Sequence, residues 1–284
     1  MKVSDKIIAP TWKDYELIDC GNGRKLERFG NVVLDRPEIA ATGSPHFPNK
    51  KWKALTQCKF TQETANSGQW TGNAAPWVIS YVTDFEIRFN LELSQFKHVG
   101  VFPEQSANWE YIFSALQRKT DARALNLFAY TGGASLAAKA AGADITHVEA
   151  FSQLIGKAKE NMESSLLSDI RWMREDALKY AQKEVKRQKY YDLIIMDPPS
   201  WGRGPKGEKW KLEKHIDELI KGVSALLAPK GHLIVNTYSG ISPKELKLML
   251  EKHLRFQKIQ VGNLVVKATS GAEFSTGSLV RGNI

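Results

Sequence analysis

Alternating apolar and polar positions mark several short strands in the first third of the chain. The clearest run extends from Phe85 to Leu93, where every second residue is apolar and the residues between are charged or amide. One face of such a strand packs on a core and the other faces water. Shorter patterns predict strands at residues 15–20, 25–30, 31–34 and 77–82, with a hairpin signal at Gly21–Gly23. We expect residues 1–94 to form a small, mostly β domain that could recognise substrate.

Residues 41–76 lack a regular pattern and are rich in Pro, Gly, Asn and Thr. This composition predicts long loops. With Trp52, Trp70 and the neighbouring Trp77, such loops could touch a substrate.

Residues 95–284 alternate between helical and strand patterns, which is typical of an α/β fold with a mostly parallel sheet. Helices are predicted at 109–118, 134–141, 153–164, 177–188, 211–227 and 243–253. Strands are predicted at 123–127, 145–148, 170–174, 192–196, 231–237, 256–266 and 277–281. No internal repeat is present.

A buried strand ends on an acid and two prolines. The apolar run Leu193–Met196 is typical of a central strand covered on both faces, and Asp197, Pro198, Pro199 and Ser200 follow it. Proline has no backbone N–H, so the chain must leave the sheet here, with the Asp197 carboxylate at the crevice where α/β sheets bind ligands. The alternative interpretation of this motif is an Asp-Pro turn that only closes the strand and binds no ligand.

A second segment has the order strand, glycine turn, helix, strand, acid. Residues 123–127 lead into Gly132 and Gly133, an alanine-rich helix follows, and the next strand ends on Glu149. In nucleotide-binding βαβ units, glycines let the backbone approach the ligand and the acid accepts hydrogen bonds from ribose hydroxyls. A plain tight turn remains the alternative for the glycine pair, and a charge near a helix N-terminus remains the alternative for Glu149.

The glycine spacing discriminates between ligands. A dinucleotide site requires G-x-G-x-x-G, and only the adjacent pair Gly132-Gly133 occurs here. A ligand with an adenosine but no phosphate fits better, and S-adenosylmethionine is the common one.

The chain resembles the class I S-adenosylmethionine-dependent methyltransferases related to the bacterial large-subunit ribosomal RNA methyltransferases. The resemblance covers roughly residues 85–284 and rests on motifs at 98–105, 125–133, 146–149, 174–177 and 197–207. It implies a Rossmann-like seven-stranded sheet, parallel except for the last strand, in a methyltransferase domain at 95–284. It also implies S-adenosylmethionine as cofactor, S-adenosylhomocysteine as product, and RNA, most directly ribosomal RNA, as substrate.

By this resemblance the cofactor is held by residues at all five motifs. Glu149 would bind the ribose hydroxyls, and Asp176 would contact the adenine amino group, although Glu175 could serve instead and Asp176 could cap the next helix. Phe102 could equally be a core residue. The cofactor-binding residues implied are Phe102, Glu104, Gln105, Asn126, Phe128, Tyr130, Thr131, Gly132, Gly133, Glu149, Ala150, Asp176, Ala177 and Asp197.

Methyl transfer from a sulfonium depends chiefly on alignment of the acceptor lone pair with the methyl group. By resemblance, Asp197, Pro198 and Pro199 carry this step, with the Asp197 carboxylate and the Pro198 carbonyl accepting hydrogen bonds from an exocyclic amine. The aromatic residue of related motifs is displaced by one, because Ser200 precedes Trp201. The Trp201 ring therefore either stacks on the substrate base or packs in the protein interior.

Cysteine usage limits both chemistry and compartment. Cys20 and Cys58 are the two cysteines, and neither follows the Asp-Pro-Pro strand, so no thiolate is placed for methylation at carbon 5 of cytosine. Attack by nitrogen or oxygen remains. Two cysteines predict neither a disulfide framework nor a metal site and suit the cytoplasm; no signal peptide or membrane helix is predicted.

Charge favours an anionic partner. The formal net charge is +9, and residues 96–284 hold 28 Lys and Arg against 20 Asp and Glu, whereas residues 1–95 are nearly balanced. Such an excess favours nucleic acid over a neutral small molecule, with a solvated basic surface as the alternative. Hydrophobic residues make up 42% of the 284, enough for a large core in about two domains. Oligomeric state cannot be read from the sequence.

The loop at 202–209 resembles a phosphate-binding loop but has Glu208 at the lysine position. We expect a basic lid over the acceptor instead, in which Arg203, Lys206 and Lys209 meet phosphates; a solvated loop is the alternative. Ser200 and Trp201 are also expected to bind substrate. Three function classes stay open: an RNA methyltransferase, a methyltransferase for a small molecule or protein, and a non-catalytic cofactor-binding module.

Overall fold

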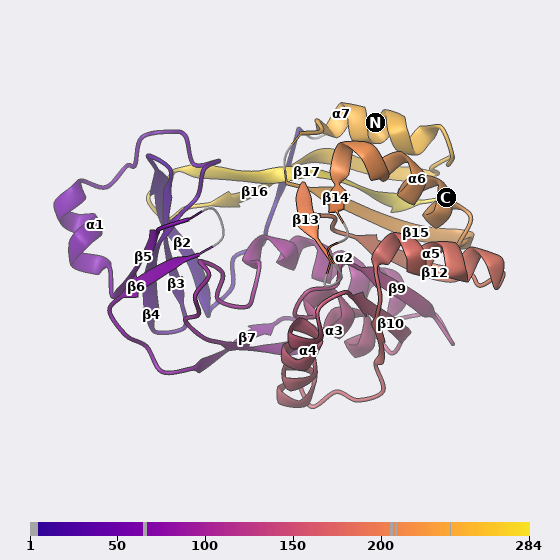
Figure 1. Cartoon of the computed structure of the whole chain (residues 1–284), viewed down its shortest axis with the longest axis horizontal. Coiled ribbons are helices and arrows are strands. Elements are labelled where there is room, and N and C mark those ends of the chain that lie inside the picture. The colour runs from indigo at the N-terminus through magenta and orange to yellow at the C-terminus, as the bar shows by residue number, and fades with distance from the viewer. Residues whose placement is uncertain (1–4, 65–66, 205–206, 208, 239) are drawn as a thin grey trace.

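The computed structural model describes residues 5–64, 67–204, 207, 209–238 and 240–284. Over these residues the chain forms a large α/β part and a smaller β part that lie side by side (Figure 1). The fold class expected from the sequence is confirmed.

The large part is built on one sheet, which has eight strands within the described residues. Its order is β1-β16-β17-β15-β12-β9-β10-β11. Neighbouring strands are parallel except at β17, which runs antiparallel to both β15 and β16. The strands are β1 (Lys6–Ile8), β9 (Arg123–Leu127), β10 (Asp144–Glu149), β11 (Arg171–Arg174), β12 (Tyr191–Met196), β15 (Leu227–Thr237), β16 (Lys258–Lys267) and β17 (Glu273–Asn283).

Seven of these strands are those expected, and β1 is an addition to the predicted seven-stranded sheet. β1 pairs parallel with Asn263–Val265 of β16 at the edge of the sheet. Its three residues are too short for a periodic pattern, so the sequence did not indicate them. The chain thus begins on the large sheet and then enters the small β part.

The two faces of β12 explain how the helices are placed. Leu193 and Ile195 belong to the core that includes residues of α2 and α3, whereas Ile194 and Met196 belong to the core beneath α5, α6 and α7. Successive side chains of a strand point to opposite faces, so a continuous apolar run is buried from both sides. The helices are α2 (Ser106–Leu116), α3 (Gly133–Ala140), α4 (Ser152–Ser164), α5 (Ala177–Lys186), α6 (Leu212–Ser224) and α7 (Pro243–Glu251), with the 3-10 helix η1 (Pro103–Gln105) before α2.

The small part holds a five-stranded sheet in the order β2-β3-β4-β5-β6 and a β7–β8 hairpin. The predicted alternation of the last strand is confirmed, because Ile87, Phe89 and Leu91 of β8 are buried. The elements are β2 (Tyr15–Gly21), β3 (Arg24–Phe29), β4 (Val32–Pro37), α1 (Asn49–Leu55), β5 (Cys58–Gln62), β6 (Gly68–Thr71), β7 (Trp77–Val82) and β8 (Glu86–Leu91).

The expectation of long loops at residues 41–76 was wrong. This segment contains α1, β5 and β6. Trp52 is the buried residue of α1, and the Trp70 indole N–H donates to the Ser94 carbonyl at 2.9 Å. Packing of these aromatic side chains overrides the turn-rich composition around them.

The β16–β17 hairpin connects the two parts. Figure 1 shows β16 and β17 as long strands that reach from the large sheet to the small one. At the hairpin end, Thr269 N donates to the Leu17 carbonyl and Ser270 N donates to the Ile18 carbonyl, at 2.9 and 3.0 Å. Both parts also contribute to one hydrophobic core. Their relative placement is therefore fixed by backbone hydrogen bonds and shared packing.

Candidate active site

A cavity of about 510 Å³ lies between the carboxyl ends of the parallel strands and the small β part. We call its two sides the strand-end wall and the N-terminal wall. The strand-end wall is formed by residues that follow β9, β10, β11 and β12. The N-terminal wall comprises Lys25, Arg36, Pro37, Glu38, Ala40, Lys97, His98, Phe274 and Thr276. The crevice expected at the ends of the parallel strands is present.

Glu149 at the end of β10 faces the cavity and orders the loop that precedes α3. Its carboxylate accepts hydrogen bonds from the backbone N–H groups of Tyr130 and Phe151, at 3.0 and 3.1 Å. Burial raises the pKa of Glu149, and these backbone donors oppose that shift. A carboxylate held by backbone donors beside a cavity suits a ligand with hydroxyl groups.

The loop after β9 holds two non-glycine residues in the left-handed region. Phe128 has φ of 58° and Tyr130 has φ of 50°, and both line the cavity. Such backbone strain is rare for aromatic residues and concentrates at functional sites. Gly132, with φ of 93°, supplies the left-handed turn into α3.

Gly133 is required by packing rather than by its backbone angle. A Cβ atom at this position would lie 2.8 to 2.9 Å from the indole ring of Trp109. Trp109 is buried and stacks on Phe89 of the small part. The glycine pair thus lets the loop turn sharply and lets α2 approach α3 closely.

Asp197 is half-buried just after β12 and is held by three side chains. The Tyr238 hydroxyl and the Gln105 amide donate to Oδ2 at 2.9 and 3.0 Å, and the Asn236 amide lies 3.3 Å from Oδ1. Burial raises the pKa of Asp197 to about 7, and the hydrogen bond from Tyr238 opposes that shift. A carboxyl group that titrates near neutral pH is suited to accept a hydrogen bond or a proton from a reacting group.

Asp176 has the capping role that the sequence left open. Its side chain accepts a hydrogen bond from Lys179 N at 2.9 Å, at the start of α5. Asp176 also lines the cavity, together with Glu175 and Ala177. The adenine contact expected of Asp176 stays a prediction.

The segment after Pro199 forms a short hairpin rather than an open loop. β13 (Trp201–Arg203) pairs antiparallel with β14 (Lys209–Lys211). The Trp210 indole N–H donates to the Pro199 carbonyl at 2.6 Å, and its ring packs against Phe128. Trp201 is 50% exposed, so the alternative of buried packing was wrong for this residue.

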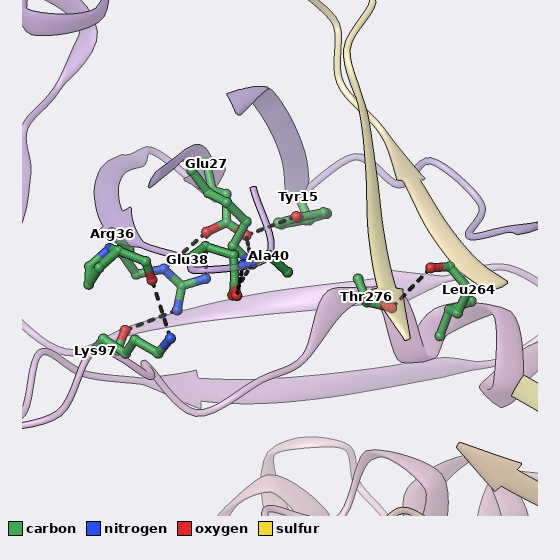
Figure 2. Close-up of polar contacts among 10 residues, drawn as sticks. Tyr15, Glu27, Arg36, Glu38, Ala40, Lys97, Leu264 and Thr276 are labelled. Atoms are coloured by element: carbon green, nitrogen blue, oxygen red, sulfur yellow. Dashed lines mark hydrogen bonds and ion pairs between the residues drawn. The ribbon is translucent and has the colours of Figure 1, made fainter. Parts of the chain in front are cut away.

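The N-terminal wall is held by a buried ion pair. The Arg36 guanidinium donates to Glu27 Oε2 through two nitrogens, at 2.6 and 3.0 Å, and the Tyr15 hydroxyl donates to Glu27 Oε1 at 3.0 Å. Figure 2 shows the Glu27 carboxylate between Tyr15 and Arg36, with Lys97 beside Arg36. Burial opposes ionisation of Glu27, but Arg36 and Lys25 outweigh it and lower the pKa to about 2.

Two further polar groups line the cavity near this ion pair. Burial lowers the pKa of His98 to about 3, with help from Arg36 and Lys97, so its imidazole is neutral at physiological pH. The Glu104 side chain is 5% exposed, and burial raises its pKa. No hydrogen bond or ion pair to a side chain is found for Glu104 within the described residues.

Most predicted cofactor residues lie together at the strand-end wall, and a minority lie behind it. The cavity is lined by Phe102, Glu104, Phe128, Tyr130, Glu149, Ala150, Asp176, Ala177 and Asp197, and also by Pro199 and Ser200. The residues that do not line it are Gln105, Asn126, Thr131, Gly132, Gly133, Pro198 and Trp201. Lys206 and the Arg203 side chain lie outside the described part of the chain.

Residues behind the wall still shape it. Gln105 reaches Asp197, Asn126 donates to Ser135 Oγ at 3.0 Å, and the Thr131 hydroxyl donates to the Gly100 carbonyl at 2.6 Å. These contacts fix the loop from which the lining residues project.

Sequence reasoning missed Tyr238, Trp210 and the N-terminal wall. Tyr238 follows β15, the strand beside β12, so its place after a parallel strand was a usable signal. Trp210 had no comparable signal, because it reaches Pro199 only through the hairpin. The residues of the N-terminal wall come from separate segments that share no motif.

A cavity at the carboxyl ends of parallel strands, with a carboxylate at the end of β10 and a left-handed turn after β9, is typical of Rossmann-like ligand-binding domains. The chain belongs to the S-adenosylmethionine-dependent methyltransferase family, whose model matches residues 24–255. It is therefore an S-adenosylmethionine-dependent methyltransferase. The resemblance stated from the sequence motifs is confirmed.

Relatives with assigned names are similar over part of their length. The chain is 28% identical over 242 residues to ribosomal RNA large subunit methyltransferase K/L of Shewanella oneidensis, covering 84% of this chain and 31% of that protein. It is 31% identical over 155 residues to the protein of the same name from Shewanella frigidimarina, covering 53% and 21%. The chain thus spans less than a third of the length of these relatives.

Solved structures match almost the whole chain. A methyltransferase from Agrobacterium tumefaciens is 34% identical with a TM-score of 0.91, covering 99% of this chain and 94% of that one. The protein SMU.776, solved in complex with SAH, is 21% identical with a TM-score of 0.72, covering 95% and 74%, and shows the shared fold.

Two searches of the described residues were negative. No helix among them is both long and apolar enough to span a bilayer. No group of three or more His, Cys, Asp or Glu side chains among them is arranged to hold a metal ion.

Proposed function

We propose that this methyltransferase acts on a nitrogen or oxygen of a base in RNA, most directly ribosomal RNA. The observation that carries the proposal is the similarity over 84% of the chain to proteins named ribosomal RNA large subunit methyltransferases. The excess of 28 basic over 20 acidic residues in the methyltransferase part supports it, because phosphate backbones attract such surfaces. A cytoplasmic location belongs to the same proposal.

The cofactor fits the strand-end wall by the chemistry of the residues present. Glu149 is proposed to bind the ribose hydroxyls and Asp176 and Ala177 to contact the adenine, and all three residues line the cavity. Glu104 is a buried carboxylate without a side-chain partner in the described residues, which suits the cationic amino group of the methionine moiety. When bound, S-adenosylmethionine supplies a methyl group activated by the adjacent sulfonium.

Asp197 is proposed to align the acceptor and to receive its hydrogen bond. The acceptor lone pair forms the new bond to carbon as the carbon–sulfur bond breaks, and those electrons remain on sulfur to give S-adenosylhomocysteine. The acceptor then releases a proton to Asp197 or to water. Tyr238 and Gln105 both donate hydrogen bonds to Oδ2 of Asp197. These bonds hold the Asp197 carboxyl group in one orientation.

The positions of the cysteines support nitrogen or oxygen as the acceptor atom. Cys20 and Cys58 are buried in the small part, and neither lines the cavity. Burial raises the pKa of Cys20 to about 11, so its thiol is a poor nucleophile at neutral pH.

A second candidate function is methylation of a small molecule. It is favoured by the N-terminal wall, because protein lines both sides of the cavity. The proposed loop contacts of Ser200, Trp201, Arg203 and Lys206 with RNA favour the first candidate.

The deciding experiment offers three classes of acceptor to the protein. Purified chain is incubated with methyl-labelled S-adenosylmethionine and separate pools of total RNA, total protein and metabolites, the RNA coming from a strain that lacks the gene. We expect label in the RNA pool. Label in metabolites or protein alone would contradict the RNA proposal.

A further inference from the structure

The cavity extends beyond the space that the cofactor residues surround. The N-terminal wall adds Lys25, Glu38, Lys97 and His98, which lie opposite the strand ends. Of these residues, Lys25, Glu38 and Lys97 lie outside the motifs assigned to the cofactor. Asp197, which is proposed to align the acceptor, lines the same cavity, so an acceptor held there can extend into this second half.

Two ammonium groups of the wall retain unused donors. Lys25 Nζ lies 3.4 Å from Glu27 and 3.7 Å from Glu38, longer than a well-formed charged hydrogen bond of about 2.8 Å. The sole hydrogen bond found for the Lys97 ammonium within the described residues is 3.3 Å long, to the Pro37 carbonyl. Burial lowers the pKa of Lys97. An ammonium group has three donors, so a ligand could satisfy those that remain.

Groups of both charges surround this space, so neither a simple anion nor a simple cation matches it. Lys25, Arg36 and Lys97 supply donors, and the carboxylates paired with them are Glu27 and Glu38. A phosphate would approach these carboxylates at the cost of repulsion, and a bare cation would meet the ammonium groups. A neutral group that carries both a carbonyl and N–H donors matches such a mixture.

The adjoining surface is aromatic. The Phe102 ring lies 5.1 Å from the rings of both His98 and Tyr130, and 5.9 Å from that of Tyr238. All four side chains line the cavity. Aromatic surfaces bind planar heterocycles by stacking.

We propose that Lys25, Glu38 and Lys97 form a subsite that binds the polar edge of one nucleobase turned out of the RNA strand. The base would stack on the aromatic surface, present carbonyl oxygen to the ammonium groups, and present N–H to the Glu38 carboxylate. Enzymes that react with a base extrude it into such a pocket and read its hydrogen-bonding edge. The inference rests on the proposed RNA methyltransferase function.

The central test replaces subsite residues and measures RNA methylation with total RNA from the strain that lacks the gene. In the Lys97→Met and Glu38→Gln variants we expect kcat/KM for RNA to fall about tenfold or more, the range found for loss of base-edge contacts. Affinity for S-adenosylhomocysteine should stay within about twofold, because these residues lie outside the motifs assigned to the cofactor. Lys97→Arg should restore part of the activity, since it keeps charge and donors.

The salt dependence of RNA binding separates base contacts from phosphate contacts. Loss of one phosphate contact lowers the slope of log K against log salt by about 0.7 to 0.9. We expect Lys97→Met to weaken binding without changing this slope. The matched control is Lys13→Met, which removes an exposed lysine of the same part that does not line the cavity.

Several outcomes would overturn the subsite. They are an unchanged kcat/KM in both variants, a reduced salt slope in Lys97→Met, or label on a ribose oxygen after digestion to nucleosides. If the Glu38→Gln variant has a normal melting temperature, its loss of kcat/KM for RNA is not caused by misfolding. Absence of RNA labelling by the wild-type chain would overturn the proposed function and the subsite together.

Discussion

The strand-end wall and the N-terminal wall face the same cavity but are built on different principles. The strand-end wall consists of short runs that follow parallel strands, with each side chain oriented by its own strand and loop. The N-terminal wall joins residues from β3, β4, the segment before η1, and β17, held by the buried Glu27–Arg36 pair. The proposed sites divide along the same line, with the cofactor residues and Asp197 on the strand-end wall and the base-edge subsite on the N-terminal wall.

The largest expected effect tests whether the N-terminal wall depends on its ion pair. Arg36→Met leaves the fully buried Glu27 carboxylate without its main partner, so we expect a loss of about 3–5 kcal/mol in the free energy of unfolding. Chemical denaturation measures it. Arg28→Met is the control, because its cross-strand pair with Glu16 of β2 is about 30% exposed and worth about 0.2–1 kcal/mol. Equal losses in the two variants would show that the buried pair does not organise the wall.

The next effect concerns the chemistry of the strand-end wall. Asp197→Asn removes a charged acceptor while keeping shape, so we expect kcat to fall about 100-fold or more. The loss in cofactor affinity should be smaller than the loss in kcat. Steady-state kinetics with calorimetry separates the two. Asp192→Asn, on the same strand but outside the cavity, is the matched control. A kcat within threefold of wild type would remove Asp197 from the reaction.

The third prediction tests which wall binds the cofactor. Glu149→Ala removes the carboxylate expected to bind ribose, and we expect affinity for S-adenosylhomocysteine to fall about tenfold to hundredfold, as for hydrogen bonds to a charged group. Asp144→Ala, at the exposed start of β10, should change it little. Calorimetry provides the measurement. The division between walls fails if Glu38→Gln weakens this affinity as much as Glu149→Ala.

The smallest effect is a pH dependence. Because burial raises the pKa of Asp197 to about 7, the carboxyl group is protonated below that pH and ionised above it. We expect kcat/KM to rise about tenfold per pH unit below pH 7 and to level off above it. His98, with its pKa lowered to about 3, should add no inflection near neutrality. A profile of Asp197→Asn that keeps the inflection would assign it to another group.

The same raised pKa has a consequence for stability. The unfolded chain loses the Asp197 proton near the ordinary pKa, whereas the folded chain keeps it to about pH 7. The stabilisation is complete at low pH and is lost as the pH rises through 7. Asp197→Asn should lack this decline.

A structural feature could be predicted from the sequence when the residues that determine it are close together along the chain. β12 and Asp197 were predictable because four apolar residues, an acid and two prolines carry the information within eight positions. β1 was not, because three residues pair with a strand more than 250 positions away. α1, β5 and β6 were missed because turn-forming residues outweighed the buried aromatic residues that order them.

The same reasoning applies to the site. Glu149, Asp176 and Asp197 each follow a strand of one sheet, so topology alone brings them together. Lys25 and Arg36 are cross-strand partners in β3 and β4, but they face the strand ends only through the docking of the small part. No local pattern encodes that docking.

The β16–β17 hairpin constrains the order in which the chain can mature. β2 is an edge strand of the small sheet, and the end of the hairpin covers it, including a 2.7 Å hydrogen bond from Ser270 Oγ to Asp19 across 251 residues. Synthesis proceeds from the N-terminus, so this edge stays uncovered until the last strands leave the ribosome. An uncovered edge invites pairing with other chains. A prematurely terminated product would therefore be prone to aggregate, although its first domain had been translated in full.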